Sequence, residues 1–358
     1  MFVISHQIMI KTINSWRGLI AVSVVMFHSG LAWAYNYAVS GVTFFFISGA
    51  FLLALRHDFE RFDARQYRRF VLSHAARLYP LHWLGLALLI LVALYSRLPV
   101  DWWATALNAL LLHGWSPAHH VHYGINPVTW YMGALLFCYI ILPFLSHLLG
   151  RWRLRYKVLA VLSVALPLAL LLLPLDIPHR EAVFVNPLSH IPDVLMALLL
   201  VHLCRVLKSR WPRVGYATAS FIELGALLLL AGFIAVNVLT TWARPWEDDL
   251  YWLLPCGTVL VTMAFLHGQE GFFGRLLMCR PLQWLGSVSF EVYVLHFAAF
   301  HIYNYIISPM AGHFGLRIYG LRSVLVWPLL FAMAWMVNRW FTRPVSAFLK
   351  QKINRLSS

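Results

Sequence analysis

The chain has 358 residues, of which 61% are hydrophobic and only 11% are charged. Soluble domains carry about 25% charged residues, so this composition could hardly cover a water-exposed surface. Apolar runs close to the ~20 residues needed to cross a bilayer recur from end to end, and helices satisfy their own backbone groups in lipid. These features exclude a soluble globular enzyme and a disordered or fibrous chain, and they predict an all-α polytopic membrane protein.

The net charge of +15 would point to nucleic acid in a soluble protein. Here the basic residues lie between apolar runs instead of forming one stripe, which is how membrane topology is encoded, so we expect no nucleic-acid partner. The four cysteines, Cys138, Cys204, Cys256 and Cys279, are far apart and form no CxxC pair. We therefore expect them to pack in the protein without a disulfide or a zinc ion.

The apolar runs predict about ten transmembrane helices in one membrane domain. The predicted spans are 16–34, 39–55, 79–96, 128–149, 158–175, 186–204, 217–240, 250–267, 284–307 and 320–341. The first run lacks a small-residue cleavage site and is expected to be a retained span. The single domain covers 1–358, with a transmembrane core at about 12–342 and a short cytoplasmic tail at 343–358.

The basic residues predict the orientation of these spans. If both termini are cytoplasmic, all but five of the 28 Lys and Arg residues fall on the cytoplasmic side, as the positive-inside rule requires. The five on the outer side are Arg97, Arg180, Arg244, Arg317 and Arg322. The apolar segment 101–113 is short, and a crossing there would place the basic loop 151–157 outside. We therefore expect 101–113 to lie in the interface or to re-enter.

Two ionisable residues in the first span are functional candidates, because a polar side chain at membrane depth is costly. Arg17 and His28 are separated by eleven steps of about 100°, which places both on one helix face, roughly 16 Å apart along the axis. Arg17 lies near the cytoplasmic end and His28 lies deep. The alternative is a snorkelling arginine and a hydrogen-bonded core histidine.

The ninth span carries an acid, a phenol and an imidazole, which is more than packing requires. Glu291 and His296 are roughly 140° apart around the helix and need not touch, whereas Tyr293 and His296 share a face. Glu291 begins about one turn inside the cytoplasmic boundary, so partial solvation is the alternative interpretation. Asp193, near the start of the sixth span, is a further buried acid.

The cytoplasmic approach to the third span gathers basic residues that could hold a polyanion such as a diphosphate. These residues are Arg68, Arg69, His74, Arg77 and His82, and Pro80 is expected to mark the helix start. Ordinary positive-inside charge or contact with lipid headgroups is the alternative.

The loop 113–127 carries four histidines and is expected on the outer side. They are His113, His119, His120 and His122. Their spacing matches no established zinc pattern and no Cys or carboxylate lies nearby, so we expect no metal and favour contact with a polar substrate.

Five ordered motifs resemble those of the acyltransferase-3 family of integral-membrane O-acyltransferases, which modify bacterial surface glycans. The matching segments are INSWRGLIAVSVVMFH (13–28), GVTFFFISGAF (41–51), HAARLYP (74–80), WYMGALLFCY (130–139) and GSVSFEVYVLH (286–296). The resemblance runs from about 12 to 342. It implies an enzyme in the bacterial inner membrane that takes an acyl group, most often acetyl, from cytoplasmic acetyl-CoA and transfers it to a glycan or lipid-linked saccharide.

The resemblance also implies roles for individual residues. The donor-binding candidates are Arg17, Arg69, His74 and Arg77; the catalytic candidates are His28, Glu291 and His296; the substrate-binding candidates are Ser48, Trp130, Tyr131 and Tyr293. Arginines at the cytoplasmic face suit the phosphates of the donor. Neutral imidazole has a suitable pKa for a general base, so we expect His28 to deprotonate the acceptor hydroxyl or relay the acyl group.

The chain departs from the family pattern at three places. His74 stands where the first arginine of R-x-x-R is usual, Thr43 stands where Asp is common, and no carboxylate follows Trp130 closely. A weaker or pH-dependent donor contact at His74 would follow. No SGNH-type hydrolase domain is expected after the last span, so a second transfer would need a partner.

Two alternatives remain open from the sequence. Buried His, Arg and Glu also occur in transporters or flippases, although the chain shows no repeated half with matching broken helices. The same fold could also transfer succinyl instead of acetyl. Membrane lipids are expected neighbours in every case.

Overall fold

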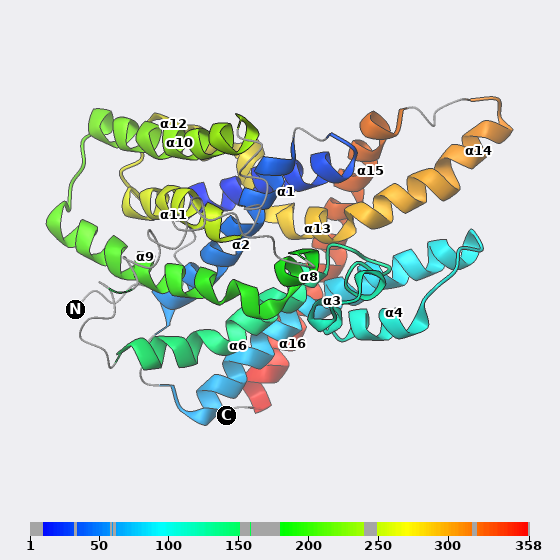
Figure 1. Ribbon diagram of the computed structural model, residues 1–358, viewed down its shortest axis with the longest axis horizontal. Coiled ribbons are helices and arrows are strands. Elements are labelled where there is room, and N and C mark those ends of the chain that lie inside the picture. The colour runs from blue at the N-terminus through cyan, green and yellow to red at the C-terminus, as the bar shows by residue number, and fades with distance from the viewer. Residues whose placement is uncertain are drawn as a thin grey trace.

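The described part of the chain is helical. The computed structural model describes residues 10–31, 34–57, 59, 62–150, 158, 180–239, 249–316 and 321–356. These residues contain helices and turns and no strand, which confirms the all-α prediction (Figure 1).

Helices of very different lengths follow one another along the chain. In order, they are α1 (Lys11–His28), α2 (Tyr35–Arg56), α3 (Ala64–Tyr95), α4 (Trp102–Ala109), η3 (His113–Trp115), α5 (His119–His122), α6 (Trp130–Gly150), α8 (Arg180–Val185), η4 (Pro187–His190), α9 (Ile191–Arg210), α10 (Tyr216–Leu239), α11 (Asp249–Phe265), α12 (Phe272–Leu277), α13 (Arg280–Ile302), η6 (Tyr303–Ile307), α14 (Ser308–His313), α15 (Arg322–Val337), η8 (Asn338–Thr342) and α16 (Arg343–Leu356). The segments η6 and η8 are π-helical and continue the helices before them.

Seven stretches of the described chain are long and apolar enough to cross a membrane. The predicted first span corresponds to α1, and the predicted eighth span corresponds to the shorter apolar helix α11. The predicted span 158–175 lies outside the described residues except for its first position. A polytopic membrane protein is thus confirmed, and the count of ten stays a prediction.

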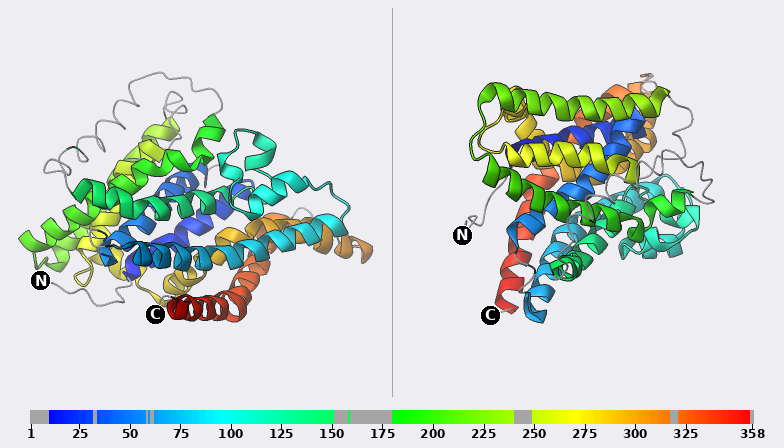
Figure 2. Two further views of the ribbon diagram at one scale, coloured as in Figure 1. Left: turned by 90° about the horizontal axis from the view of Figure 1, so that it is seen from below. Right: turned by 60° about the vertical axis from the view of Figure 1, so that its left-hand side comes forward.

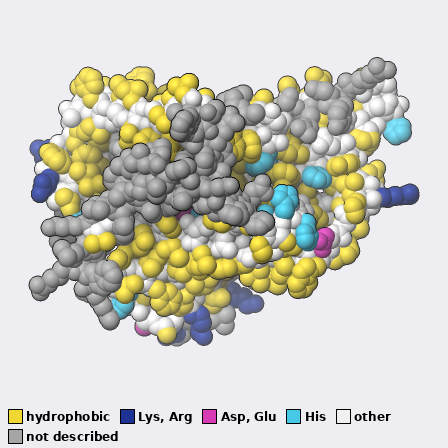
Figure 3. Space-filling model, in the orientation of Figure 1, with side chains coloured by type: hydrophobic (Ala, Val, Ile, Leu, Met, Phe, Trp, Pro, Cys, Tyr) yellow, Lys and Arg dark blue, Asp and Glu magenta, His cyan; other side chains and the backbone are white. Residues whose placement is uncertain are grey.

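The surface agrees with a membrane environment. Hydrophobic side chains cover most of the described surface on the face shown in Figure 3, and the Lys and Arg side chains lie at its margins. Lipid tails can surround such an apolar belt, while the charged groups remain near water and headgroups.

The helix α2 lies at the centre of the bundle and packs against α1, α6, α9 and α11 (Figure 2). Its residues are apolar all round, and most are buried, including the consecutive Phe44, Phe45 and Phe46. A helix that is apolar on every side is typical of a buried position. The helix therefore contributes side chains to several neighbouring surfaces at once.

Among the described helices, the most extensive contact is between α1 and α13, and two glycines allow it. A Cβ on Gly18 would lie 2.7 Å from the backbone nitrogen of Gly286, and a Cβ on Gly286 would collide with the backbone carbonyl of Asn14. The Gln283 amide adds hydrogen bonds to the Lys11 carbonyl at 2.9 Å and the Ser15 hydroxyl at 2.6 Å. Small residues allow membrane helices to approach closely in this way.

Two helix boundaries differ from the sequence predictions. Pro80 does not start the third helix: α3 begins at Ala64, because Asp63 and Gln66 form a reciprocal capping box, and the helix continues through the proline. The helix α1 ends at His28 rather than near position 34. The segment 101–113, in contrast, agrees with the prediction that it does not cross: it contains the short helix α4, which at about 1.5 Å per residue is too short to span a bilayer.

A first prediction concerns the glycine contact. The substitution Gly286→Ala should destabilise the protein by about 1–3 kcal/mol, because the added methyl group meets rigid backbone rather than a mobile side chain. Thermal unfolding in detergent, followed by size-exclusion chromatography, measures the loss.

The matched control is Gly232→Ala in α10, where an added Cβ meets no atom within 4 Å in the described structure. Alanine favours a helix over glycine, so this variant should be as stable as the wild type or more so. Equal stability of Gly286→Ala and the wild type would contradict the close-contact interpretation.

Candidate active site

A cavity of about 640 Å³ opens among α1, α2, α3, α6, α13 and α16, and we call it the inner cavity. The name follows the predicted cytoplasmic side. Five of the predicted site residues line it: Arg17, His74, Arg77, Tyr131 and Tyr293. The fold thus brings together, around one cavity, residues that are distant in the sequence.

The inner cavity is positively charged. Besides Arg17 and Arg77, the cations Arg56 and Lys350 line it, and the described lining residues include no Asp or Glu. The Arg17 Nε atom is buried and has no hydrogen-bond partner in the described structure, and its guanidinium lies 5.5 Å from the centre of the Phe45 ring. A buried donor of this kind is suited to an anionic ligand, and arginine is well matched to phosphate.

Sequence reasoning did not assign Arg56 and Lys350 to the site. Arg56 ends α2 and Lys350 belongs to α16, and the sequence indicated only ordinary cytoplasmic charge at both positions. The helix α16 packs against α3, which brings Lys350 to the cavity. The sequence predicted only a short cytoplasmic tail at 343–358, without the place where it packs.

A second cavity, of about 510 Å³, lies among α1, α2, α6, α8 and α13, and we call it the outer cavity. Its walls are largely aromatic and contain His28, Trp130 and Tyr293 from the predicted set. The other aromatic lining residues are Phe27, Tyr35, Tyr123, Phe184 and Phe297. Tyr293 belongs to the walls of both cavities, so the two spaces meet at this side chain.

The structure places His28 beside His296. The Nδ1 atom of His28 lies 3.2 Å from Nε2 of His296, and the two rings are stacked with centroids 5.1 Å apart. The Nδ1 atom of His296 lies 2.6 Å from the Tyr293 carbonyl, which can only accept a hydrogen bond. In the neutral pair, His296 therefore donates through Nδ1, and its Nε2 accepts from Nδ1 of His28.

This hydrogen-bond chain has a chemical consequence. It leaves the Nε2 atom of His28 without a proton, so that this atom can accept one. His296 is fully buried, whereas His28 is partly exposed and lines the outer cavity. The arrangement of a base oriented by a buried partner is typical of general-base catalysis.

Besides the buried His296, three predicted residues lie apart from the walls of the two cavities. The Glu291 carboxylate is buried and accepts a hydrogen bond from the Asn338 side chain of η8 at 2.8 Å, rather than facing His28. The Ser48 hydroxyl donates to the Phe45 carbonyl within α2 at 3.2 Å. Arg69 is exposed on α3 and is not part of the inner-cavity wall. Their assigned roles stay predictions.

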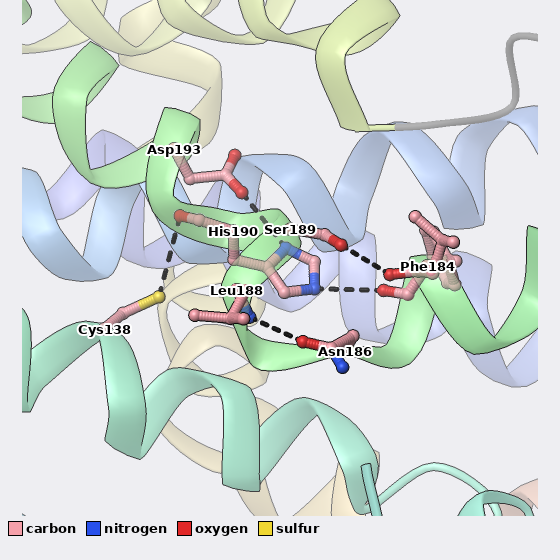
Figure 4. Close-up of polar contacts among 8 residues, drawn as sticks. Cys138, Phe184, Asn186, Leu188, Ser189, His190 and Asp193 are labelled. Atoms are coloured by element: carbon pink, nitrogen blue, oxygen red, sulfur yellow. Dashed lines mark hydrogen bonds and ion pairs between the residues drawn. The ribbon is translucent and has the colours of Figure 1, made fainter. Parts of the chain in front are cut away.

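A buried pair, His190 and Asp193, contacts Phe184, which lines the outer cavity (Figure 4). The His190 ring lies 3.1 Å from the Asp193 carboxylate through Nδ1 and 3.1 Å from the Phe184 carbonyl through Nε2. Both side chains are fully buried. Because the carbonyl can only accept, Nε2 carries a proton, and Nδ1 shares a single further proton with Asp193.

The same imidazole forms an aromatic stack. His190 lies flat on Phe46, with centroids 3.9 Å apart, and parallel to Trp130, with centroids 5.8 Å apart. Trp130 and Phe184 both line the outer cavity. His190 therefore fixes the backbone of Phe184 through a hydrogen bond and the ring of Trp130 through stacking. The sequence analysis named Asp193 as a buried acid but did not pick out His190, three residues before it; the spacing of the pair was the available signal, whereas the other partners of His190 lie on α2, α6 and α8.

The four histidines of loop 113–127 differ in burial. His113 and His122 are buried, whereas His119 and His120 are exposed. Burial, with His82 and His122 nearby, lowers the pKa of His113 to about 3, so this ring is neutral at physiological pH. No cluster in the described part of the chain is arranged to hold a metal ion.

A second prediction concerns the buried pair. The substitution Asp193→Ala should lower stability by about 3 kcal/mol or more, because it leaves a buried imidazole nitrogen without its partner. Asp193→Asn keeps a hydrogen-bonding side chain and should lose much less. Thermal unfolding of both variants in detergent measures the difference, and equal losses would contradict the shared-proton interpretation.

Comparison with known families agrees with this geometry. The profile of the acyltransferase-3 family, described as an acyltransferase domain, matches residues 10–337. Searches of curated proteins and of solved structures gave no match. The matched range contains both cavities except for Lys350, and it covers most of the chain. The chain therefore belongs to the acyltransferase-3 family and is an acyltransferase.

Proposed function

We propose that this protein transfers an acetyl group from cytoplasmic acetyl-CoA to a hydroxyl of a cell-surface or lipid-linked glycan. The observation that carries this proposal is the pairing of a cationic inner cavity with an aromatic outer cavity that contains a histidine base, the two meeting at Tyr293. The protein acts in the bacterial inner membrane with both termini in the cytoplasm.

The inner cavity supports a polyanionic donor. Coenzyme A carries phosphate groups, and the cavity presents Arg17, Arg56, Arg77 and Lys350 without a competing carboxylate among its described lining residues. Charge-assisted hydrogen bonds to phosphate are among the strongest in proteins. The ring of His74 also lines this cavity, with its Nδ1 atom 2.7 Å from the Phe70 carbonyl. Because Nδ1 donates to that carbonyl, Nε2 of the neutral ring can accept a hydrogen bond from an N–H or O–H group of coenzyme A, and it can donate to a phosphate only when the ring is protonated.

The outer cavity supports a saccharide acceptor. Its aromatic side chains present flat apolar faces, while the backbone and His28 supply polar contacts. Trp130 has its ring plane fixed by His190, so it provides a rigid surface for the C–H face of a sugar ring. The ring of Tyr131 contacts both Trp130 and Tyr293.

The reaction follows from these positions. The acceptor hydroxyl gives its proton to Nε2 of His28 while its oxygen attacks the thioester carbonyl, forming the new C–O bond. The C–S bond then breaks, the electron pair leaves with sulfur, and His28 returns the proton to the thiolate. The products are an O-acetyl ester and the free thiol of coenzyme A. Such a base contributes about 10²–10⁴ in rate.

His296 acts as a positioning residue in this scheme. Its hydrogen bonds fix the tautomer of His28 and allow the positive charge that develops during transfer to be shared across the stacked rings. Glu291 lies on the same helix and holds η8 through Asn338, so we assign it a supporting role in the site.

A third prediction tests the base. The substitution His28→Ala should lower acetyl transfer at least 100-fold at normal expression, because the proton acceptor is lost. The measurement is incorporation of radiolabelled acetyl from acetyl-CoA into envelope glycan by membranes. His301→Ala on α13 is the matched control, because this histidine lines neither cavity.

The outcomes separate the alternatives. Equal incorporation by His28→Ala and wild type would remove His28 as the base while keeping the enzyme. No incorporation by wild-type membranes, followed by incorporation from succinyl-CoA, would indicate a succinyltransferase. No incorporation from either donor would contradict this donor assignment.

A fourth prediction tests donor binding. The substitution Arg77→Gln should raise KM for acetyl-CoA about tenfold with a smaller change in kcat, because one charged contact to phosphate is lost. Arg65→Gln, on the exposed N-terminal turn of the same helix, should leave KM near the wild-type value. Similar KM values for both variants would contradict phosphate binding at the inner cavity.

A further inference from the structure

Three aromatic rings lie where the two cavities meet. Phe45 comes from α2, Tyr131 from α6 and Tyr293 from α13, and each side chain is nearly fully buried. The centroid distances are 5.9 Å for Phe45–Tyr131, 6.1 Å for Phe45–Tyr293 and 5.1 Å for Tyr131–Tyr293. All three pairs are thus in the range of direct aromatic contact. We call this group the ring triangle.

Each ring of the triangle is held from outside. The Tyr293 hydroxyl donates to the Val128 carbonyl at 3.0 Å, and Tyr131 packs against Phe46 with centroids 4.7 Å apart. Phe45 lies under the Arg17 guanidinium. Because neighbours on several helices fix the rings, widening the gap between them requires a shift of packed side chains, which is costly in a close-packed interior.

The triangle separates the phosphate-binding groups from the base. Phe45 and Tyr131 line the inner cavity together with Arg17 and Arg77, while His28 lines the outer cavity and Tyr293 lines both. A donor held by its phosphates on the inner side must therefore present its thioester at the triangle in order to meet the acceptor. The acyl chain is the part of the donor that meets the rings.

We infer that the ring triangle limits the length of the acyl group that the enzyme transfers. This inference rests on the proposed acyl-CoA-dependent transfer. A two-carbon acetyl group needs little space beside the rings, whereas each additional methylene must displace a packed aromatic side chain. Overpacking of this kind is unfavourable, and one methylene in a shaped pocket changes selectivity by about 10–200-fold. Phe45 is the specificity-determining residue that has no hydrogen-bonding role.

The neighbouring phenylalanine offers a matched control. Phe44 is as deeply buried as Phe45 on the same helix, but it packs against Trp16 and lies outside both cavity walls. Replacing Phe44 removes the same number of atoms from α2 without opening the triangle. A comparison of the two positions therefore separates a change in acyl selectivity from a general loosening of the core.

The experiment measures transfer of radiolabelled acetyl and butyryl groups from their CoA thioesters to envelope glycan, in membranes with equal amounts of each variant. The readout is the ratio of butyryl to acetyl transfer. We expect a low ratio for the wild type, an increase of at least ~10-fold for Phe45→Ala and a smaller increase for Phe45→Leu. Phe44→Leu should keep the wild-type ratio.

Different outcomes would overturn the length limit and the proposed function. Acetyl transfer with an unchanged ratio in the Phe45 variants would overturn the length limit while keeping the enzyme. Equal butyryl and acetyl transfer by the wild type would also overturn the length limit while keeping the enzyme. If Phe45→Ala does not accumulate, Phe45→Leu decides, because it retains most of the buried volume. Absence of acetyl transfer by the wild type would overturn the proposed function and the length limit with it.

Discussion

The close contact between α1 and α13 is the constraint on which the site depends. Gly18 and Gly286 let the two backbones approach closely, and no larger side chain would fit between them. This approach sets the register that places His28 against His296 near one end of the pair. The same register leaves Arg17 at the inner cavity, with its guanidinium over the Phe45 ring. His28 and Arg17 are therefore both positioned by the contact between α1 and α13, which itself contains no charge.

Much of the site could be predicted from the sequence, because it follows helical periodicity. Arg17 and His28 share a face of one helix, and Tyr293 and His296 share a face of another, so local spacing already indicated two functional faces. Because a polar residue inside a membrane is costly, the polar residues on these faces also indicated function. What periodicity does not provide is the partner of each face, and the pairing of α1 with α13 joins residues more than half the chain apart.

The residues that were missed or remain unsupported show the same limit. His190 was not picked out, although its partner Asp193, three residues later, was; its other contacts, with Phe46, Trp130 and Phe184, lie on three other elements and could not be read from the sequence. Glu291 was grouped with His296 because both are polar and on one helix. A separation of roughly 140° turns its carboxylate toward Asn338 instead. In α3, Pro80 is a strong local signal, but the capping box at Asp63 begins the helix earlier.

The division into two cavities also answers an energetic problem of chemistry in a membrane. The phosphates of a CoA donor are strongly hydrated, and burying them in an apolar medium without compensation would cost far more than the reaction could supply. With cations at the inner cavity and rings between that cavity and the base, the charged part of the donor need never enter the apolar centre. Only a small neutral acyl group has to reach the rings. The selectivity that we infer for short acyl chains is then a direct consequence of keeping charge on one side of the bilayer.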